Sequence, residues 1–205
     1  VPAHQDFKKK VPAKAYKAAE RNGLVYVYMG KKKPPPLPDI EACMLPEEET
    51  EYHFVLRECN WLQAVEGELD SSHVGFLHFG AAQKKDFAKN DLGKYIVSNR
   101  APEYYVKDTD YGVVYGSHRS GDKGQTYWRI AHFLFPCWAM PPIEHMDRNL
   151  RARAYVPVDD NHAMVVMVYQ KPESAGPEAE ARWFAGASHN YRHLPRTTDW
   201  YGRYR

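Results

Sequence analysis

A short segment with two histidines and an aspartate, Asp70, His73 and His78, holds the residues best suited to chemistry. At about 100° per residue, an unbroken helix would place the two imidazoles about 140° apart, with Asp70 between them. Both can reach one metal ion only if the helix bends or ends between them, which Gly75 would allow. Two histidines and one carboxylate form the ligand set of non-haem Fe(II) oxygenases. The spacing therefore predicts an iron site with two of its three ligands visible.

The spacing alone leaves a second interpretation open, because D-x2-H-x4-H is a short pattern. In that interpretation His73 and His78 are a surface and a core histidine, and no metal binds. Other histidines stand alone in strand-like or loop-like sequence, where a structural role is commoner; these are His118, His132 and His145.

The sequence around the histidines resembles a known family over residues 58–79. The matching residues are Asn60, Trp61, Gln63, Glu66, Gly67, Asp70, His73, Phe76, Leu77 and His78. They resemble the iron-binding segment of the Rieske non-haem iron aromatic-ring-hydroxylating oxygenases, oxygenase (alpha) component, in the phthalate dioxygenase and aromatic O-demethylase branch. Residues 21–30 with the proline-rich stretch behind them resemble the end of the family's Rieske domain, and residues 155–160 resemble a strand and turn of its catalytic domain.

The resemblance implies a role for each residue of this segment. His73 and His78 would bind mononuclear Fe(II), and Asp70 would bridge His73 to a cluster-binding histidine of a neighbouring subunit. Glu66, one turn earlier, would lie close to the iron. The implied reaction is reductive activation of O2, which hydroxylates or O-demethylates an aromatic substrate, often an aromatic acid.

The resemblance also implies cofactors and partners. Electrons would pass from NAD(P)H through a reductase or ferredoxin to a [2Fe-2S] cluster, and members of this branch form trimers or hexamers. The cluster motif, C-x-H followed by C-x2-H, is absent from these 205 residues. The family's third iron ligand lies on a late helix, so Glu178, Glu180 and Asp199 are not assigned to the metal. We therefore expect a segment of a longer protein that cannot turn over alone.

The sequence indicates the substrate-binding residues less clearly than the metal ligands. Phe135 and Trp138 belong to the most apolar strand-to-loop run and are candidates for a pocket wall, although a core role is commoner for such residues. Arg100, Arg119 and Arg129 are candidates for binding a substrate carboxylate, because a guanidinium pairs with it bidentately. For each arginine an exposed surface position is the alternative.

Composition narrows the class of protein. The net charge is +2 and 43% of residues are hydrophobic, which is typical of a folded globular domain and disfavours a strongly basic nucleic-acid binder. The longest stretch of low polarity, residues 133–143, contains three prolines and is shorter than the roughly 20 residues of a membrane helix. Three widely spaced cysteines, Cys43, Cys59 and Cys137, form no metal motif and favour a reducing, cytoplasmic location.

The first forty residues predict a small β unit followed by a linker. Asn22-Gly23 favours a type I′ turn between strands at 14–20 and 24–28. Residues 31–40 contain four prolines and predict a stiff connector. We therefore expect residues 1–30 to be the last strands of a Rieske-type domain, 31–40 a linker, and 41–205 a catalytic domain that is incomplete at its C-terminal end.

The remaining elements must position the histidine segment. Asn60 is a predicted helix cap, with Gln63 in the capping-box position and Trp61, Leu62, Val65 and Leu69 as the buried stripe. Strands are predicted at 52–57, 94–99, 103–107, 112–118, 126–135, 151–158 and 162–170, and a helix at 177–187. This order indicates an α+β fold in which an antiparallel meander wraps on helices, as in the helix-grip (Bet v1/START-like) catalytic domain of the family. The alternative function is a metal-free helix-grip module that binds an apolar ligand.

Overall fold

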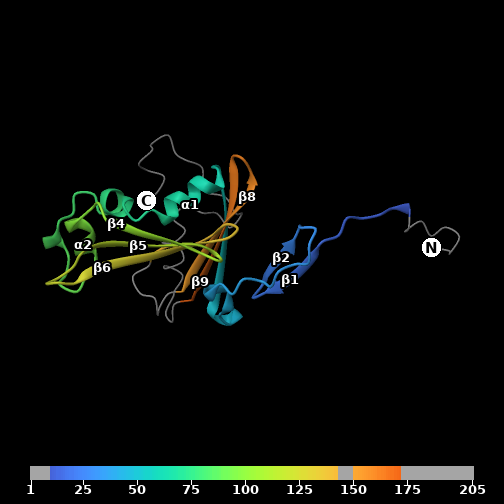
Figure 1. Ribbon diagram of the computed structural model, residues 1–205, viewed down its shortest axis with the longest axis horizontal. Coiled ribbons are helices and arrows are strands. Elements are labelled where there is room, and N and C mark those ends of the chain that lie inside the picture. The colour runs from blue at the N-terminus through green and yellow to red at the C-terminus, as the bar shows by residue number, and fades with distance from the viewer. Residues whose placement is uncertain (1–9, 143–149, 172–205) are drawn as a thin grey trace.

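An antiparallel sheet forms the body of the computed structural model, which describes residues 10–142 and 150–171 (Figure 1). Its seven strands lie in the order β3-β9-β8-β7-β6-β5-β4, and every neighbouring pair is antiparallel. The strands are β3 (Thr50–Arg57), β4 (Glu103–Thr109), β5 (Gly112–Ser120), β6 (Thr126–Leu134), β7 (Trp138–Met140), β8 (Arg151–Asp159) and β9 (His162–Gln170). From β4 to β9 they pair in sequence order, so the predicted α+β fold with an antiparallel meander is confirmed.

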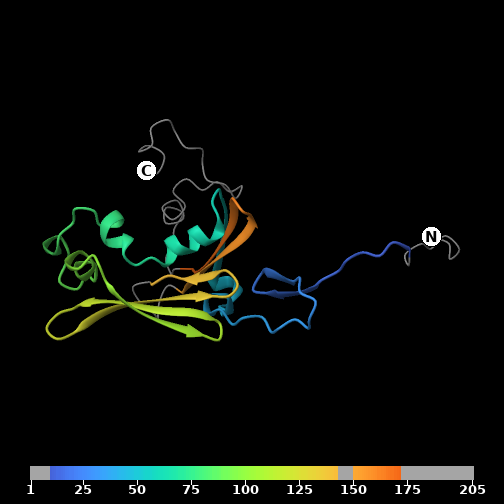
Figure 2. The same ribbon diagram turned by 45° about the horizontal axis from the view of Figure 1, so that its top comes forward.

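One helix of the chain, α1 (Trp61–Leu69), lies against a face of this sheet (Figure 2). Asn60 caps it as predicted, because its Oδ1 accepts a hydrogen bond of 3.0 Å from the backbone N–H of Leu62. Val65 and Ala64 are buried, but Leu62 is 46% exposed, so its assignment to the buried stripe is wrong. The stripe is centred on Trp61 and Val65, and Ala64 rather than Leu62 forms its flank.

Two local assignments differ from the expectation. Residues 94–99 were expected to be a strand, but Gly93–Ser98 form helix α2. Tertiary contacts outweigh the strand propensity of Ile96 and Val97: the Tyr95 hydroxyl donates to Asp122 Oδ2 at 2.7 Å, and the Lys94 ammonium donates to the same atom at 3.1 Å. Strand β7 was not expected, because it spans three residues and offers no alternation to detect.

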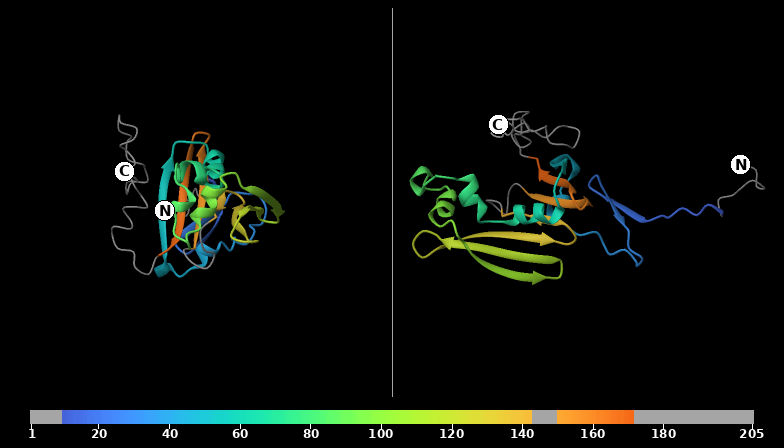
Figure 3. Two further views of the ribbon diagram at one scale, coloured as in Figure 1. Left: turned by 90° about the vertical axis from the view of Figure 1, so that its left-hand side faces the viewer. Right: turned by 90° about the horizontal axis from the view of Figure 1, so that it is seen from above.

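The predicted N-terminal hairpin is present and packs beside the sheet (Figure 3). Strands β1 (Lys17–Arg21) and β2 (Leu24–Tyr28) are joined by Asn22 and Gly23, whose φ angles of 48° and 78° are those of a type I′ turn. Leu24 and Tyr26 pack against a core cluster of the main sheet. The proposed domain boundaries remain a prediction.

The core and the short helices complete the described part of the chain. Short helical turns occur at η3 (Glu41–Met44), η4 (Glu47–Glu49), η5 (Val74–His78) and η6 (Lys84–Asp86). Cys43 and Cys137 are buried, Cys59 is half-buried, and all three are free thiols, as expected for small apolar residues. No helix within residues 10–142 and 150–171 is long and apolar enough to cross a membrane. His145, Glu178, Glu180, Asp199 and the helix predicted at 177–187 lie outside the described residues.

Candidate metal centre

The segment that carries the histidines is not one continuous helix. Helix α1 ends at Leu69, and Asp70 adopts an extended conformation with φ −63° and ψ 118°. The carboxylate of Asp70 then accepts hydrogen bonds from the backbone N–H groups of Ser72 (2.8 Å) and His73 (3.0 Å). Such a bond from an aspartate to its own following backbone turns the chain sharply. Helix α1 therefore ends before both histidines, and the bend predicted between them is a separate feature, the π-helical turn that contains Gly75.

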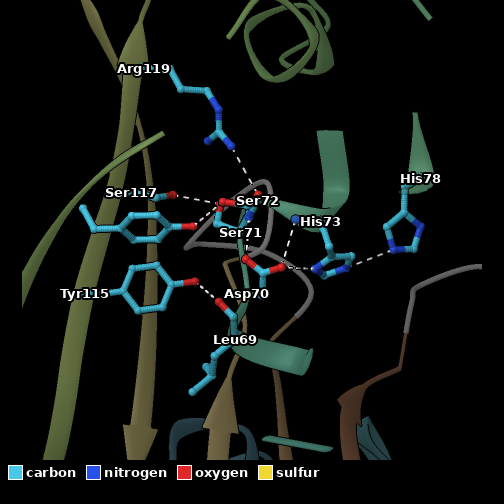
Figure 4. A network of polar contacts seen from close by, with 10 residues as sticks. Leu69, Asp70, Ser71, Ser72, His73, His78, Tyr115, Ser117 and Arg119 are labelled. Atoms are coloured by element: carbon cyan, nitrogen blue, oxygen red, sulfur yellow. Dashed lines mark hydrogen bonds and ion pairs between the residues drawn. The ribbon is translucent and has the colours of Figure 1, made fainter. Parts of the chain in front are cut away.

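A π-helical turn brings the two histidines together. Residues Val74–His78 form η5, in which the N–H of Phe79 bonds to the carbonyl of Val74 at 3.1 Å, an i to i+5 contact. His73 and His78 are five residues apart, so this wider turn places them on one side, where 3.6 residues per turn would separate them. Their Nε2 atoms lie 3.2 Å apart (Figure 4).

The separation of the two nitrogens fits a shared metal ion. Imidazole nitrogens bind first-row metals at about 2.1 Å. Two such nitrogens in neighbouring positions of an octahedral or a tetrahedral ion are then about 3.0 to 3.4 Å apart. The Nε2–Nε2 distance of 3.2 Å between His73 and His78 lies inside that range. Imidazole donors also suit iron chemically.

Asp70 contacts the imidazole of His73 on the side of the ring that faces away from His78. Its Oδ2 lies 3.3 Å from Nδ1 of His73, the ring nitrogen that faces away from His78. This Nδ1 is buried and makes no hydrogen bond within the described residues, so the carboxylate is its closest ionic contact there. The Asp70 side chain remains 41% exposed, which leaves it open toward solvent or another chain.

The other ligand candidates do not join this pair in the described part of the chain. Glu66 is exposed on α1, and its backbone carbonyl accepts the hydrogen bond from the Asp70 N–H. Residues 10–142 and 150–171 contain no group of three or more His, Cys, Asp or Glu residues that could hold a metal. His118 lies 3.8 Å from Glu103 and stacks near Trp128, which is a structural environment.

The residues expected to line a substrate pocket have different surroundings. Trp138 is 5% exposed and belongs to the core cluster, whereas Phe135 is 64% exposed. A shared pocket wall is therefore not visible in these two side chains, and their role in substrate binding remains a prediction.

The three candidate arginines are all tied to backbone carbonyls. Arg100 donates to the carbonyl of Ala82 at 2.8 Å, Arg129 donates to that of Pro142 at 2.7 Å, and Arg119 donates to those of Asn99 and Ser71. Arg119 is 1% exposed, so its expected surface alternative is wrong. Burial, and then the nearby charge of Arg129, lower the pKa of Arg119. Neither Arg119 nor Arg129 has a carboxylate partner within the described residues.

A buried polar cluster beneath α1 was missed by sequence reasoning. Arg153 of β8 contacts Glu68 of α1 at 2.5 Å, and the Tyr155 hydroxyl donates to the same carboxylate oxygen at 2.8 Å. Tyr169 of β9 accepts a further hydrogen bond from Arg153 at 3.2 Å. Eighty-five residues separate Glu68 from Arg153, and no local pattern signals such a pairing.

Comparison with known proteins decides the family. A family model described as "LigXa C-terminal domain like" matches residues 27–193. The chain belongs to this family. The match, together with the relatives below, confirms the resemblance of the LigXa C-terminal-like chain to the oxygenase component of Rieske non-haem iron oxygenases.

Two curated relatives of this LigXa C-terminal-like chain are oxygenase subunits. The 3-chlorobenzoate-3,4-dioxygenase oxygenase subunit of Comamonas testosteroni is 37% identical over 206 residues, covering 97% of this chain and 47% of the relative. The phthalate 4,5-dioxygenase oxygenase subunit of Pseudomonas putida is 31% identical over 201 residues, covering 90% of this chain and 44% of the relative. The chain thus spans about half the length of the curated relatives it matches.

Solved structures support the fold. The terminal oxygenase of carbazole 1,9a-dioxygenase from Nocardioides aromaticivorans IC177 matches with a TM-score of 0.51 and 18% identity, covering 91% of this chain and 59% of that one. Dicamba monooxygenase bound to 3,6-dichlorosalicylic acid matches with a TM-score of 0.52 and 14% identity, covering 81% of this chain and 53% of that one. The antiparallel fold of the LigXa C-terminal-like chain is therefore that of a terminal oxygenase.

Proposed function

We propose that this chain is the catalytic portion of a Rieske-type oxygenase, in which His73 and His78 hold a mononuclear Fe(II). The observation that carries the proposal is the 3.2 Å separation of their Nε2 atoms, which is the spacing of two neighbouring ligands on one ion. The convergence of the imidazoles favours this function over a metal-free module for apolar ligands. When bound, the iron supplies the O2-activating chemistry that amino-acid side chains lack.

In this proposal Asp70 orients the iron-binding imidazole of His73. Its carboxylate lies 3.3 Å from Nδ1, and such a contact fixes the ring and raises the basicity of the ligand nitrogen. Because Asp70 is partly exposed, it also offers a polar route by which an electron reaches the site from another subunit. The third iron ligand, a homo-oligomer and a [2Fe-2S] cluster with an NAD(P)H-dependent reductase or ferredoxin belong to the same proposal.

We further propose that the substrate is an aromatic acid. The relatives named for 3-chlorobenzoate and phthalate act on aromatic carboxylates. The guanidinium groups of buried Arg119 and half-buried Arg129, which have no carboxylate partner in the described part of the chain, give a positive environment for such a group. Hydroxylation and O-demethylation are both compatible with this site.

The iron assignment is tested by metal analysis of the full-length protein. The wild type should bind about one mononuclear iron per chain in addition to cluster iron, and His73→Ala should lose it because a single imidazole remains. Asp70→Asn should keep the iron but lose turnover with an aromatic acid, because the amide cannot replace the carboxylate beside Nδ1. Full retention of mononuclear iron by His73→Ala would overturn the assignment.

A further inference from the structure

Strand β5 directs three alternating side chains at the turn that precedes the metal centre. Tyr115, Ser117 and Arg119 share one face of the strand, because successive side chains of a strand point to opposite sides. All three contact residues 69–71, the turn between α1 and His73 (Figure 4). The order of the contacts along β5 matches their order along the turn.

Each contact uses a different polar group of the turn. The Tyr115 hydroxyl donates to the carbonyl of Leu69, and Ser117 Oγ donates to Ser71 Oγ at 2.8 Å. Arg119 Nη2 donates to the carbonyl of Ser71 at 3.2 Å. Ser71 and Ser117 are fully buried and Arg119 is 1% exposed, so water does not compete for the hydrogen bonds that Ser117 and Arg119 make to Ser71.

The turn has little other support. Residue 70 has left the α-helix and His73 is already the cap of the π-helical turn, so Ser71 and Ser72 lie between the two helices without a place in either. The Asp70 carboxylate bonds to backbone N–H groups inside the turn, which shapes it but does not anchor it to the sheet. The side chains of β5 provide that anchor, and a hydrogen bond of 2.8 Å between the Tyr104 hydroxyl of the edge strand β4 and Ser72 Oγ adds to it.

We propose that Tyr115, Ser117 and Arg119 are positioning residues for the metal centre, which hold Asp70 and His73 at the distance and angle that the ion requires. The inference rests on the proposed iron site and adds residues of β5 that touch no ligand of the metal. A shift of the turn would move His73 relative to His78, because His78 lies on η5 and is not held by β5.

The test measures cobalt binding by the full-length protein after removal of mononuclear iron. Tyr115→Phe and Ser117→Ala remove single hydroxyl groups, and their combination avoids the unfolding risk of deleting buried Arg119. The matched control is Tyr105→Phe. It also removes a tyrosine hydroxyl, but from an exposed residue on the face of β4 opposite to Tyr104, which contacts the turn. A titration with Co(II) gives the affinity of the site for the metal, and the visible absorption of bound Co(II) depends on the geometry of its ligands.

We expect the Tyr115→Phe/Ser117→Ala variant to bind Co(II) about 10-fold or more weakly, as for other residues that orient metal ligands, and to change its visible spectrum. Tyr105→Phe should match the wild type in both. Unchanged affinity and spectrum in the double variant, while His73→Ala loses Co(II), would overturn the positioning role and leave the proposed function standing. If His73→Ala binds Co(II) as the wild type does, the metal centre itself is refuted.

Discussion

At the scale of single residues, the buried pair of Glu68 and Arg153 joins α1 to the sheet. Both side chains are largely buried, and the Tyr155 hydroxyl donates a further hydrogen bond to the same carboxylate. Desolvation by burial lowers the pKa of Arg153, but Glu68, Tyr169 and Tyr155 together outweigh this effect, so the pKa is raised. The guanidinium is therefore charged at every accessible pH and depends on its partner.

We expect Glu68→Gln to lower the free energy of unfolding by about 3 to 5 kcal/mol, because it leaves the Arg153 charge buried without a counter-ion. Urea unfolding measures this loss. The control is Asp39→Asn, which removes a carboxylate from an exposed pair with Arg21 and should cost less than about 1 kcal/mol. A second variant, Glu68→Gln with Arg153→Met, should recover part of the stability; equal losses in single and double variants would contradict the buried-charge explanation.

At the scale of elements, Asn60 both caps α1 and links it to the turn between β8 and β9. Its Oδ1 accepts from the Leu62 N–H, and its Nδ2 donates to the carbonyl of Asp160 at 3.1 Å. Asn60→Ala should cost about 1 kcal/mol through loss of the cap. Asn60→Ser keeps a cap oxygen but loses the hydrogen bond to Asp160. Its free energy of unfolding, measured with denaturant, should therefore lie between those of Asn60→Ala and the wild type. Equal stability of Ala and Ser would show that the cap contributes nothing.

Elements with a local signal could be predicted from the sequence, and those set by distant contacts could not. Asn22-Gly23 requires positive φ and Asn60 precedes an apolar stripe, so the hairpin and the start of α1 were both predicted correctly. Helix α2 was mistaken for a strand, because it depends on Asp122, which lies far away in the chain. The need for a bend between His73 and His78 was predicted, but its π-helical form was not, because such a turn has no recognisable sequence pattern.

At the scale of the whole molecule, the N-terminal hairpin is attached to the main sheet through its turn. Asn22 Nδ2 donates to the carbonyl of Leu45 and to Thr50 Oγ1, each at 2.9 Å. Arg21 bonds to Asp39 at 2.8 Å and to the carbonyl of Pro38 at 2.7 Å, so the end of the proline-rich linker is fixed as well. With Leu24 and Tyr26 packed on the core, these contacts make the hairpin part of one body with the sheet.

Asn22→Gly should loosen this attachment while it preserves the turn, because glycine accepts positive φ but has no amide to donate. The loss of two hydrogen bonds should cost about 1 to 2 kcal/mol. Hydrogen exchange followed by mass spectrometry should then be faster both in residues 17–28 and in residues 40–50. The control, Asn161→Gly in the exposed β8–β9 turn, should affect its own turn only. Faster exchange confined to residues 17–28 after Asn22→Gly would mean that the hairpin moves independently of the sheet.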